Sequence, residues 1–264
     1  LDFYADGSVQ FEAFKAGESS SFRELNAERW ENSYDFDAVS DGDVIKSVIP
    51  HQRPSGITGF VMNTRLPKFN DWRVREALIA AFNFEFINQA NTGGRQNRIT
   101  SYYSNSVLSM KPGPASGREL EFLAPHKANL LPGTLEGYSL PKSDGTARNR
   151  KNIQRADELL NQAGWTVQDG LRRNDQGQTF EIVTVLKQGD TESQSMMDIY
   201  QQALERLGIK LSSEVLDSAQ YKERTQIYDF DMAYYRRGLS LSPGNEQMLY
   251  WGADGIKKPG TRNW

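Results

Sequence analysis

Segments with helical apolar spacing alternate with short β-rich segments along most of this 264-residue chain. The sequence predicts helices within residues 8–18, 70–84, 148–164, 191–208 and 219–228. It predicts strands at residues 43–50, 57–64, 209–216 and 229–235, and two further strands within residues 170–186. Such alternation is typical of α/β proteins with a mixed or mostly parallel sheet. We therefore expect an α/β fold with helices flanking the sheet.

The helix predicted at residues 70–84 has the clearest pattern in the chain. Its apolar positions recur at helical spacing, at Val74, Leu78, Ala81 and Phe82. Asn70 or Asp71 is available as the N-cap, because a short polar side chain there can accept from the first free backbone amides. Leu78 and Phe82 are accordingly predicted to lie in the core.

Periodicity fades between residues 93 and 149, where glycine, proline, serine and asparagine dominate. A loop-rich stretch of this length inside a compact domain is usually functional or specialised. We therefore expect this excursion to serve the function of the protein.

Composition excludes several classes of function. Charged residues make up 25% of the chain and the net charge is −3, which does not favour nucleic acid or an anionic membrane as a partner. The chain has no cysteine, so it has no thiolate catalysis, no cysteine-based zinc site and no disulfide. No signal peptide opens the sequence, and its first residues read as the interior of a folded element. We therefore expect this chain to be a fragment of a longer protein.

Catalytic patterns are weak. His51 and His126 are far apart and next to proline or turn residues, and the common phosphate-binding, zinc-protease and hydrolase motifs do not occur. No cofactor and no metal site is expected. Asp229 and Asp231 share a face if their segment is a strand, so a hydrolase using these carboxylates is the alternative function.

The loop "RRGLSLSPGNEQMLYW", residues 236–251, follows the strand predicted at residues 229–235. Ligands of α/β folds bind where loops leave the carboxyl ends of strands. The loop is therefore a candidate ligand-contacting segment.

Several motifs resemble one protein family in the same order. The stretch "GFVMNTRLPKFNDWRVREALIAAFN" is similar to a segment of the extracellular solute-binding proteins of family 5, the peptide, dipeptide and nickel receptors of ABC importers. "FEAFKAGE", "ADELLNQAGW" and "QGQTFEIVTVL" resemble further blocks of that family. "YYSNSVLSM" and "RRGLSLSPGNEQMLYWGADGIKKPGTRNW" resemble the branch of oligopeptide receptors related to the microcin C uptake protein.

The resemblance implies a type II periplasmic binding protein, whose two lobes close like a clamshell around a ligand. It implies capture of peptides or peptide-like molecules in the periplasm, or outside the cell in association with the envelope, and delivery to the membrane permease of an ABC importer. No chemistry on the ligand is implied, and a monomer is expected. Residues 1–55 match the end of lobe one and the hinge crossover, and residues 56–264 match a C-terminally truncated lobe two.

In this setting the loop after the last predicted strand belongs to the lobe-two wall of the peptide cleft. The candidate ligand-binding residues are Arg236, Arg237, Ser240, Ser242 and Asn245. Peptide receptors outside this branch often have an aspartate at the position of Ser240, which holds the amino terminus of the ligand. Ser240 carries no charge, so this contact is not expected here. The arginines instead offer donors for a carboxylate or phosphate of the ligand. Strand alternation predicts that only one of the two arginines faces the cleft. Alternatively, one arginine pairs with Asp229 or Asp231.

Overall fold

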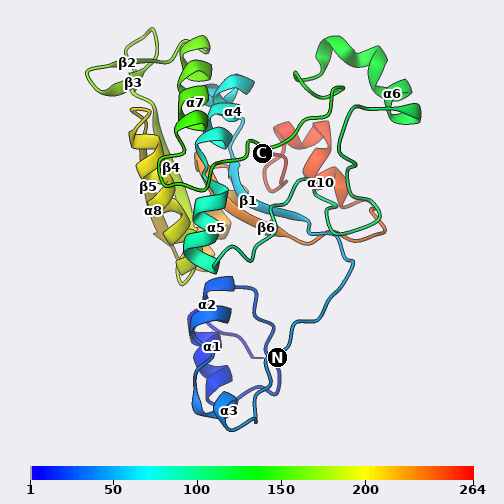
Figure 1. Ribbon diagram of the computed structural model, residues 1–264, viewed down its shortest axis with the longest axis vertical. Coiled ribbons are helices and arrows are strands. Elements are labelled where there is room, and N and C mark those ends of the chain that lie inside the picture. The colour runs from blue at the N-terminus through cyan, green and yellow to red at the C-terminus, as the bar shows by residue number, and fades with distance from the viewer. Residues whose placement is uncertain (1) are drawn as a thin grey trace.

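A four-stranded sheet organises the larger part of the chain in the computed structural model, which describes residues 2–264 (Figure 1). Its strands are β1 (Ile57–Met62), β4 (Glu181–Lys187), β5 (Lys210–Leu216) and β6 (Met232–Arg237). They lie in the order β1-β6-β4-β5. Strand β4 pairs in parallel with β5 and β6, and β1 pairs antiparallel with β6. The sheet is therefore mixed, as the sequence predicts.

Helices cover both faces of this sheet. They are α4 (Trp72–Ala81), α5 (Phe84–Thr92), α7 (Arg150–Gln162), α8 (Thr191–Glu205) and α9 (Ser218–Gln226). On one face Ile182 and Leu186 of β4 pack in a cluster with side chains of α4, α7 and α8. On the other face Val185 packs with Tyr221 of α9. Side chains of a strand alternate between faces, so β4 contributes to two cores.

A separate two-stranded sheet precedes β4. It consists of β2 (Thr166–Gln168) and β3 (Leu171–Arg173), which pair antiparallel. The two strands predicted within residues 170–186 are therefore present as β3 and β4. Strand β3 pairs with β2 and not with β4. A single antiparallel bridge joins Arg173, the last residue of β3, to Thr179, two residues before β4.

The helix predicted at residues 70–84 is divided into α4 and α5. Asp71 is the N-cap of α4 and its side chain accepts from the Arg73 amide at 2.8 Å. At Phe82 the backbone becomes extended, and the side-chain amide of Asn83 donates to the Thr146 carbonyl at 2.7 Å. The break thus coincides with a long-range contact that local apolar spacing does not report.

Leu78→Ala is expected to lower the free energy of unfolding by about 2–5 kcal/mol, because it removes a packed side chain that is 1% exposed. Urea denaturation measures the loss. Leu131→Ala is the matched control, since Leu131 is exposed and its truncation opens no cavity. A loss below about 0.5 kcal/mol for Leu78→Ala would show that this face of α4 is not part of the core.

Three short helices precede the sheet: α1 (Gly7–Lys15), α2 (Ala27–Asn32) and α3 (Asp37–Ser40). Helix α1 confirms the helix predicted within residues 8–18. Phe11 and Phe14 of α1 form an aromatic cluster with Phe22, Tyr34 and Phe36. These residues give the N-terminal helices a small core of their own, and α2 also contacts α5.

The prediction of a strand at residues 43–50 is wrong. The segment is irregular, and Ile45, Val48 and Ile49 are 83%, 80% and 78% exposed. A strand forms only when a neighbouring strand takes its backbone hydrogen bonds. None of the strands in residues 2–264 pairs with this segment, so its β-branched residues do not produce one.

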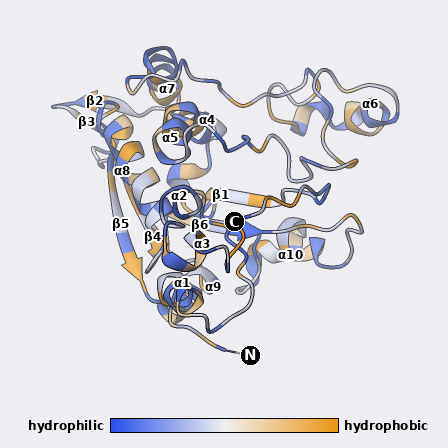
Figure 2. Cartoon of the chain, turned by 60° about the horizontal axis from the view of Figure 1, so that its bottom comes forward, coloured by the Kyte–Doolittle hydropathy of each residue, from blue (hydrophilic) through white to orange (hydrophobic). Residues whose placement is uncertain are grey.

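The excursion predicted at residues 93–149 is largely irregular, with one helix, α6 (Gly117–Leu123), followed by a 3₁₀ segment (Ala124–Asn129). Helix α6 lies well away from the sheet in both views (Figures 1 and 2). Polar contacts attach the excursion to the core. The Tyr138 hydroxyl donates to Glu76 of α4 at 2.8 Å, and Glu76 pairs with Arg155 of α7 at 2.9 Å.

Candidate functional site

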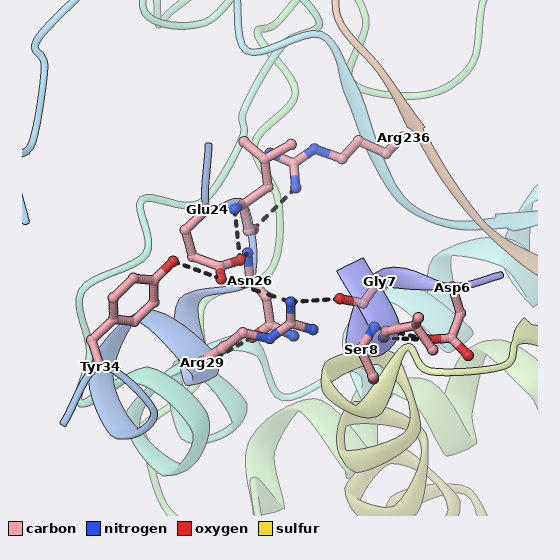
Figure 3. Close-up of polar contacts among 10 residues, drawn as sticks. Asp6, Gly7, Ser8, Glu24, Asn26, Arg29, Tyr34 and Arg236 are labelled. Carbon is pink, nitrogen blue, oxygen red and sulfur yellow. Dashed lines mark hydrogen bonds and ion pairs between the residues drawn. The ribbon is translucent and has the colours of Figure 1, made fainter. Parts of the chain in front are cut away.

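The last residues of β6 place two arginines on opposite faces of the sheet. Side chains alternate along the strand, so Arg236 shares a face with Tyr234 and Arg237 shares a face with Tyr235. Arg236 donates from Nη1 to the Leu25 carbonyl at 3.2 Å. It therefore points toward the N-terminal helices (Figure 3).

Arg236 meets a turn at residues 24–26 that is held by a buried carboxylate, and we call it the Glu24 turn. The Glu24 side chain is 4% exposed and accepts from the amides of Leu25 and Asn26 at 2.8 and 2.7 Å (Figure 3). The Tyr34 hydroxyl donates to the same carboxylate at 3.2 Å. Burial, followed by the charge of Glu24, raises the pKa of Tyr34. The Leu25 carbonyl that Arg236 contacts is thus fixed in place.

The charge of Arg236 also acts on Glu192 at the start of α8. Asp190 caps this helix by accepting from the Ser193 amide at 3.1 Å. Burial raises the pKa of the nearby Glu192 carboxyl, the charge of Asp190 adds to this, and Arg236 opposes it. Arg236 therefore already has an acceptor and a nearby carboxylate within the chain.

Arg237 has a different environment. Within residues 2–264 its guanidinium has no hydrogen-bond or ion-pair partner, and the side chain is exposed. Ser240 and Ser242, in the loop that follows, form a local turn in which the Ser242 amide donates to Ser240 Oγ at 3.1 Å. The Ser240 hydroxyl donates to the Ser242 carbonyl at 3.0 Å. Asn245 is exposed, and its carbonyl accepts from the Met248 amide.

The five predicted binding residues lie at the end of β6 and in the exposed loop that follows it. Arg236 and Arg237 are the last two residues of β6, and Ser240, Ser242 and Asn245 lie in the loop. The two arginines lie on opposite faces of β6, as strand alternation predicts, and the orientation of one of them into a peptide cleft stays a prediction. The assignment of these residues to a ligand stays a prediction.

The excursion approaches this loop through Gly56. The Gly56 amide donates to the Tyr102 carbonyl at 2.9 Å. A Cβ atom added to Gly56 would lie 2.1 Å from the Arg237 carbonyl oxygen. Gly56 also has a φ of +77°, so glycine alone fits the close approach. Tyr102 stacks on Trp251 of α10 (Gln247–Trp251), with ring centroids 4.9 Å apart. Sequence analysis missed Tyr102, because no local pattern connects it to Trp251.

The carboxylates of the alternative function are used in structural contacts. Asp231 accepts from the Val183 amide at 2.7 Å and pairs with Lys68 at 2.8 Å. Asp229 pairs with Arg224 at 3.0 Å. The alternative that Arg236 or Arg237 pairs with one of these aspartates is therefore wrong, because other cations occupy them.

The two histidines lie on exposed segments. His51 Nδ1 accepts from the Arg53 amide at 3.2 Å, and His126 lies in the 3₁₀ segment after α6. Across residues 2–264, no three histidine, aspartate or glutamate side chains gather in a way that could hold a metal ion. In the same part of the chain no helix has the length and apolar character needed to cross a membrane.

Comparison with known protein families identifies the family of the chain. The sequence profile of bacterial extracellular solute-binding proteins, family 5 Middle, matches residues 1–258. The chain belongs to this family. The resemblance stated from the motifs is therefore confirmed.

Relatives cover the chain along its whole length. A Brucella melitensis biotype 1 protein whose name describes it as a binding protein is 38% identical over 265 residues, covering 100% of this chain and 43% of the relative. The peptidoglycan-binding protein YepA of Agrobacterium fabrum is 33% identical over 277 residues, covering 100% of this chain and 44% of its own length. The chain thus spans less than half the length of these relatives.

A solved structure shares the fold. The oligopeptide-binding protein AppA of Bacillus subtilis, in complex with a nonapeptide, superposes with a TM-score of 0.70 at 18% identity. The match covers 97% of this chain and 43% of AppA. The predicted fold, that of a type II periplasmic binding protein, is confirmed.

Proposed function

We propose that this chain is part of a receptor that captures peptides or peptide-like molecules and delivers them to the permease of an ABC importer. The observation that carries the proposal is the exposed end of β6 and the loop after it, where the Arg237 guanidinium has no partner within residues 2–264. Membership of a solute-binding family and the peptide complex of AppA support it. The receptor works in the periplasm or outside the cell, changes no bond of its ligand and acts as a monomer.

The lobe assignment belongs to the same proposal. Residues 1–55 form the end of lobe one and the hinge crossover, and residues 56–264 form lobe two. Two features support this division: the N-terminal helices have their own aromatic cluster, and residues 43–55 between them and β1 are largely irregular. In this arrangement the Arg236 contact with the Glu24 turn joins the two lobes.

Arg237 is the proposed anion-binding group of the ligand site. A guanidinium can donate to both oxygens of a carboxylate, so it suits the carboxyl terminus or an acidic side chain of a peptide. Ser240, Ser242 and Asn245 lie in the exposed loop beside it and offer further polar contacts. Small side chains there also let a ligand approach the main chain closely.

Arg237→Ala in the full-length receptor is expected to cost about 1.5–3 kcal/mol of affinity for an anionic peptide, the range for hydrogen bonds to charged groups. Arg236→Ala is the matched control and should cost less, because Arg236 contacts the Leu25 carbonyl on the other face. Isothermal titration calorimetry measures both. Wild-type affinity in both folded variants would remove this loop from the anion site.

A further inference from the structure

We propose that Tyr102 and Trp251 form a stacking platform that selects peptide ligands carrying a ring with an apolar face. This inference rests on the proposed function and names the chemical class of its ligand. The platform is outside the five residues that the sequence predicts for binding. Its members come from the excursion and from α10, two segments far apart in the sequence.

The two rings are paired and remain open to solvent. Their centroids lie 4.9 Å apart with an angle of 25° between the planes. Tyr102 is 47% exposed and Trp251 is 49% exposed, so stacking covers part of each ring and leaves the rest accessible. Exposed Met248 precedes Trp251 by three residues in the same short helix, so the two side chains share a face of α10. Large apolar side chains gathered on a surface mark binding sites more often than isolated ones do.

Hydrogen bonds hold the indole of Trp251 in one orientation. Its Nε1 donates to Gln247 Oε1 at 2.9 Å, and Gln247 Nε2 donates to Glu246 Oε1 at 3.1 Å. The Glu246 carboxylate accepts in turn from the Gly244 amide at 3.0 Å. The indole N–H is therefore already satisfied, and a ligand is offered the apolar surface of the ring. Fixing the ring beforehand lowers the entropic cost of binding.

Backbone contacts fix the Tyr102 side of the platform. The Tyr102 carbonyl accepts from the Gly56 amide, and the Ser104 carbonyl accepts from the Ser55 amide, both at 2.9 Å. These two bonds tie the turn to the chain just before β1. The platform is thus built from two anchored segments.

The platform is placed next to the proposed anion site. Gly56 contacts the backbone of both Tyr102 and Arg237. The charge of Arg237 also contributes to lowering the pKa of Glu246, after the larger effects of the Gly244 amide and Gln247. A peptide whose carboxylate meets Arg237 can therefore place a neighbouring group on the rings. An aromatic side chain and the C–H face of a sugar both present such a ring.

The test uses isothermal titration calorimetry of the full-length receptor with three peptides of equal charge. One is an N-acetylated all-alanine tetrapeptide, one is an N-acetylated tetrapeptide with a single tryptophan, and one is the all-alanine tetrapeptide with an N-acetylmuramyl group on its amine. The wild type is expected to bind a ring-bearing peptide about tenfold more tightly than the alanine peptide. Trp251→Ala should abolish this preference and leave the alanine peptide unaffected, while Trp251→Phe should retain most of it.

Phe122→Ala is the control, because Phe122 is exposed on α6 and outside the platform. Preference for the tryptophan peptide alone identifies an aromatic side chain, and preference for the muramyl peptide alone identifies a sugar. Equal affinity for all three peptides, or a preference that survives Trp251→Ala, overturns the platform. Absence of binding to any of them overturns the proposed function instead.

Discussion

Arg172→Ala is expected to lower the free energy of unfolding by about 3–5 kcal/mol. Arg172 of β3 is 0% exposed, and all three of its nitrogens donate. Nε donates to the Leu207 carbonyl at 2.8 Å, and Nη1 donates to Asn161 and to the Trp165 carbonyl at 2.9 and 3.1 Å. Nη2 pairs with Asp157. Truncation removes all of these hydrogen bonds and opens a cavity.

Urea denaturation measures this loss against Arg173→Ala. Arg173 is the next residue in the same strand, but it is not buried and donates to the Gly177 carbonyl in an exposed turn. Its truncation should cost less than about 1 kcal/mol. Equal losses in the two variants would mean that the buried guanidinium does not hold β3 against α7 and the end of α8.

The isolated 264-residue chain is expected to fold and to bind peptides poorly. The strands and covering helices of its four-stranded sheet follow one another within residues 57–237, which favours independent folding. A two-lobed receptor divides its ligand contacts between lobes. A full-length receptor with a dissociation constant near 1 μM has a binding free energy of about 8 kcal/mol. Half of that free energy corresponds to a dissociation constant near 1 mM. The entropic cost of association does not halve with the contacts, which weakens binding further.

Calorimetry of the isolated chain and of the full-length receptor with the same peptide compares the two affinities directly. Circular dichroism and a cooperative unfolding transition serve as the control for folding of the isolated chain. Submicromolar binding by the isolated chain as a monomer would contradict the division of the site between two lobes.

Local patterns predict the elements whose own apolar spacing decides their structure. Helices α4, α8 and α9 and strands β1 and β5 lie where the sequence places them. Strand β6, predicted at residues 229–235, runs instead from Met232 to Arg237, so the two arginines belong to the strand and not to the loop. The other two failures depend on contacts outside the segment concerned. Residues 43–50 have the residue types of a strand but no partner strand in the part of the chain that the structure describes. The break between α4 and α5 occurs where Asn83 contacts Thr146.

The candidate site was predictable to the level of one loop. Strand alternation indicates that Arg236 and Arg237 face opposite ways, but it does not say which faces the ligand. Arg236 donates to the Leu25 carbonyl, which is 211 positions away in the sequence, and the contact of Arg237 with a ligand stays a proposal. The pairing of Tyr102 with Trp251 is also long-range, so neither residue type nor spacing reveals it.

Native mass spectrometry of the full-length receptor with a peptide tests the central claim most directly. We predict a complex whose mass exceeds that of the free receptor by one intact peptide, and recovery of the same unchanged peptide on release. Cleavage products that depend on Asp229 or Asp231 would support the hydrolase instead. Failure of the folded receptor to retain any peptide would contradict capture for import.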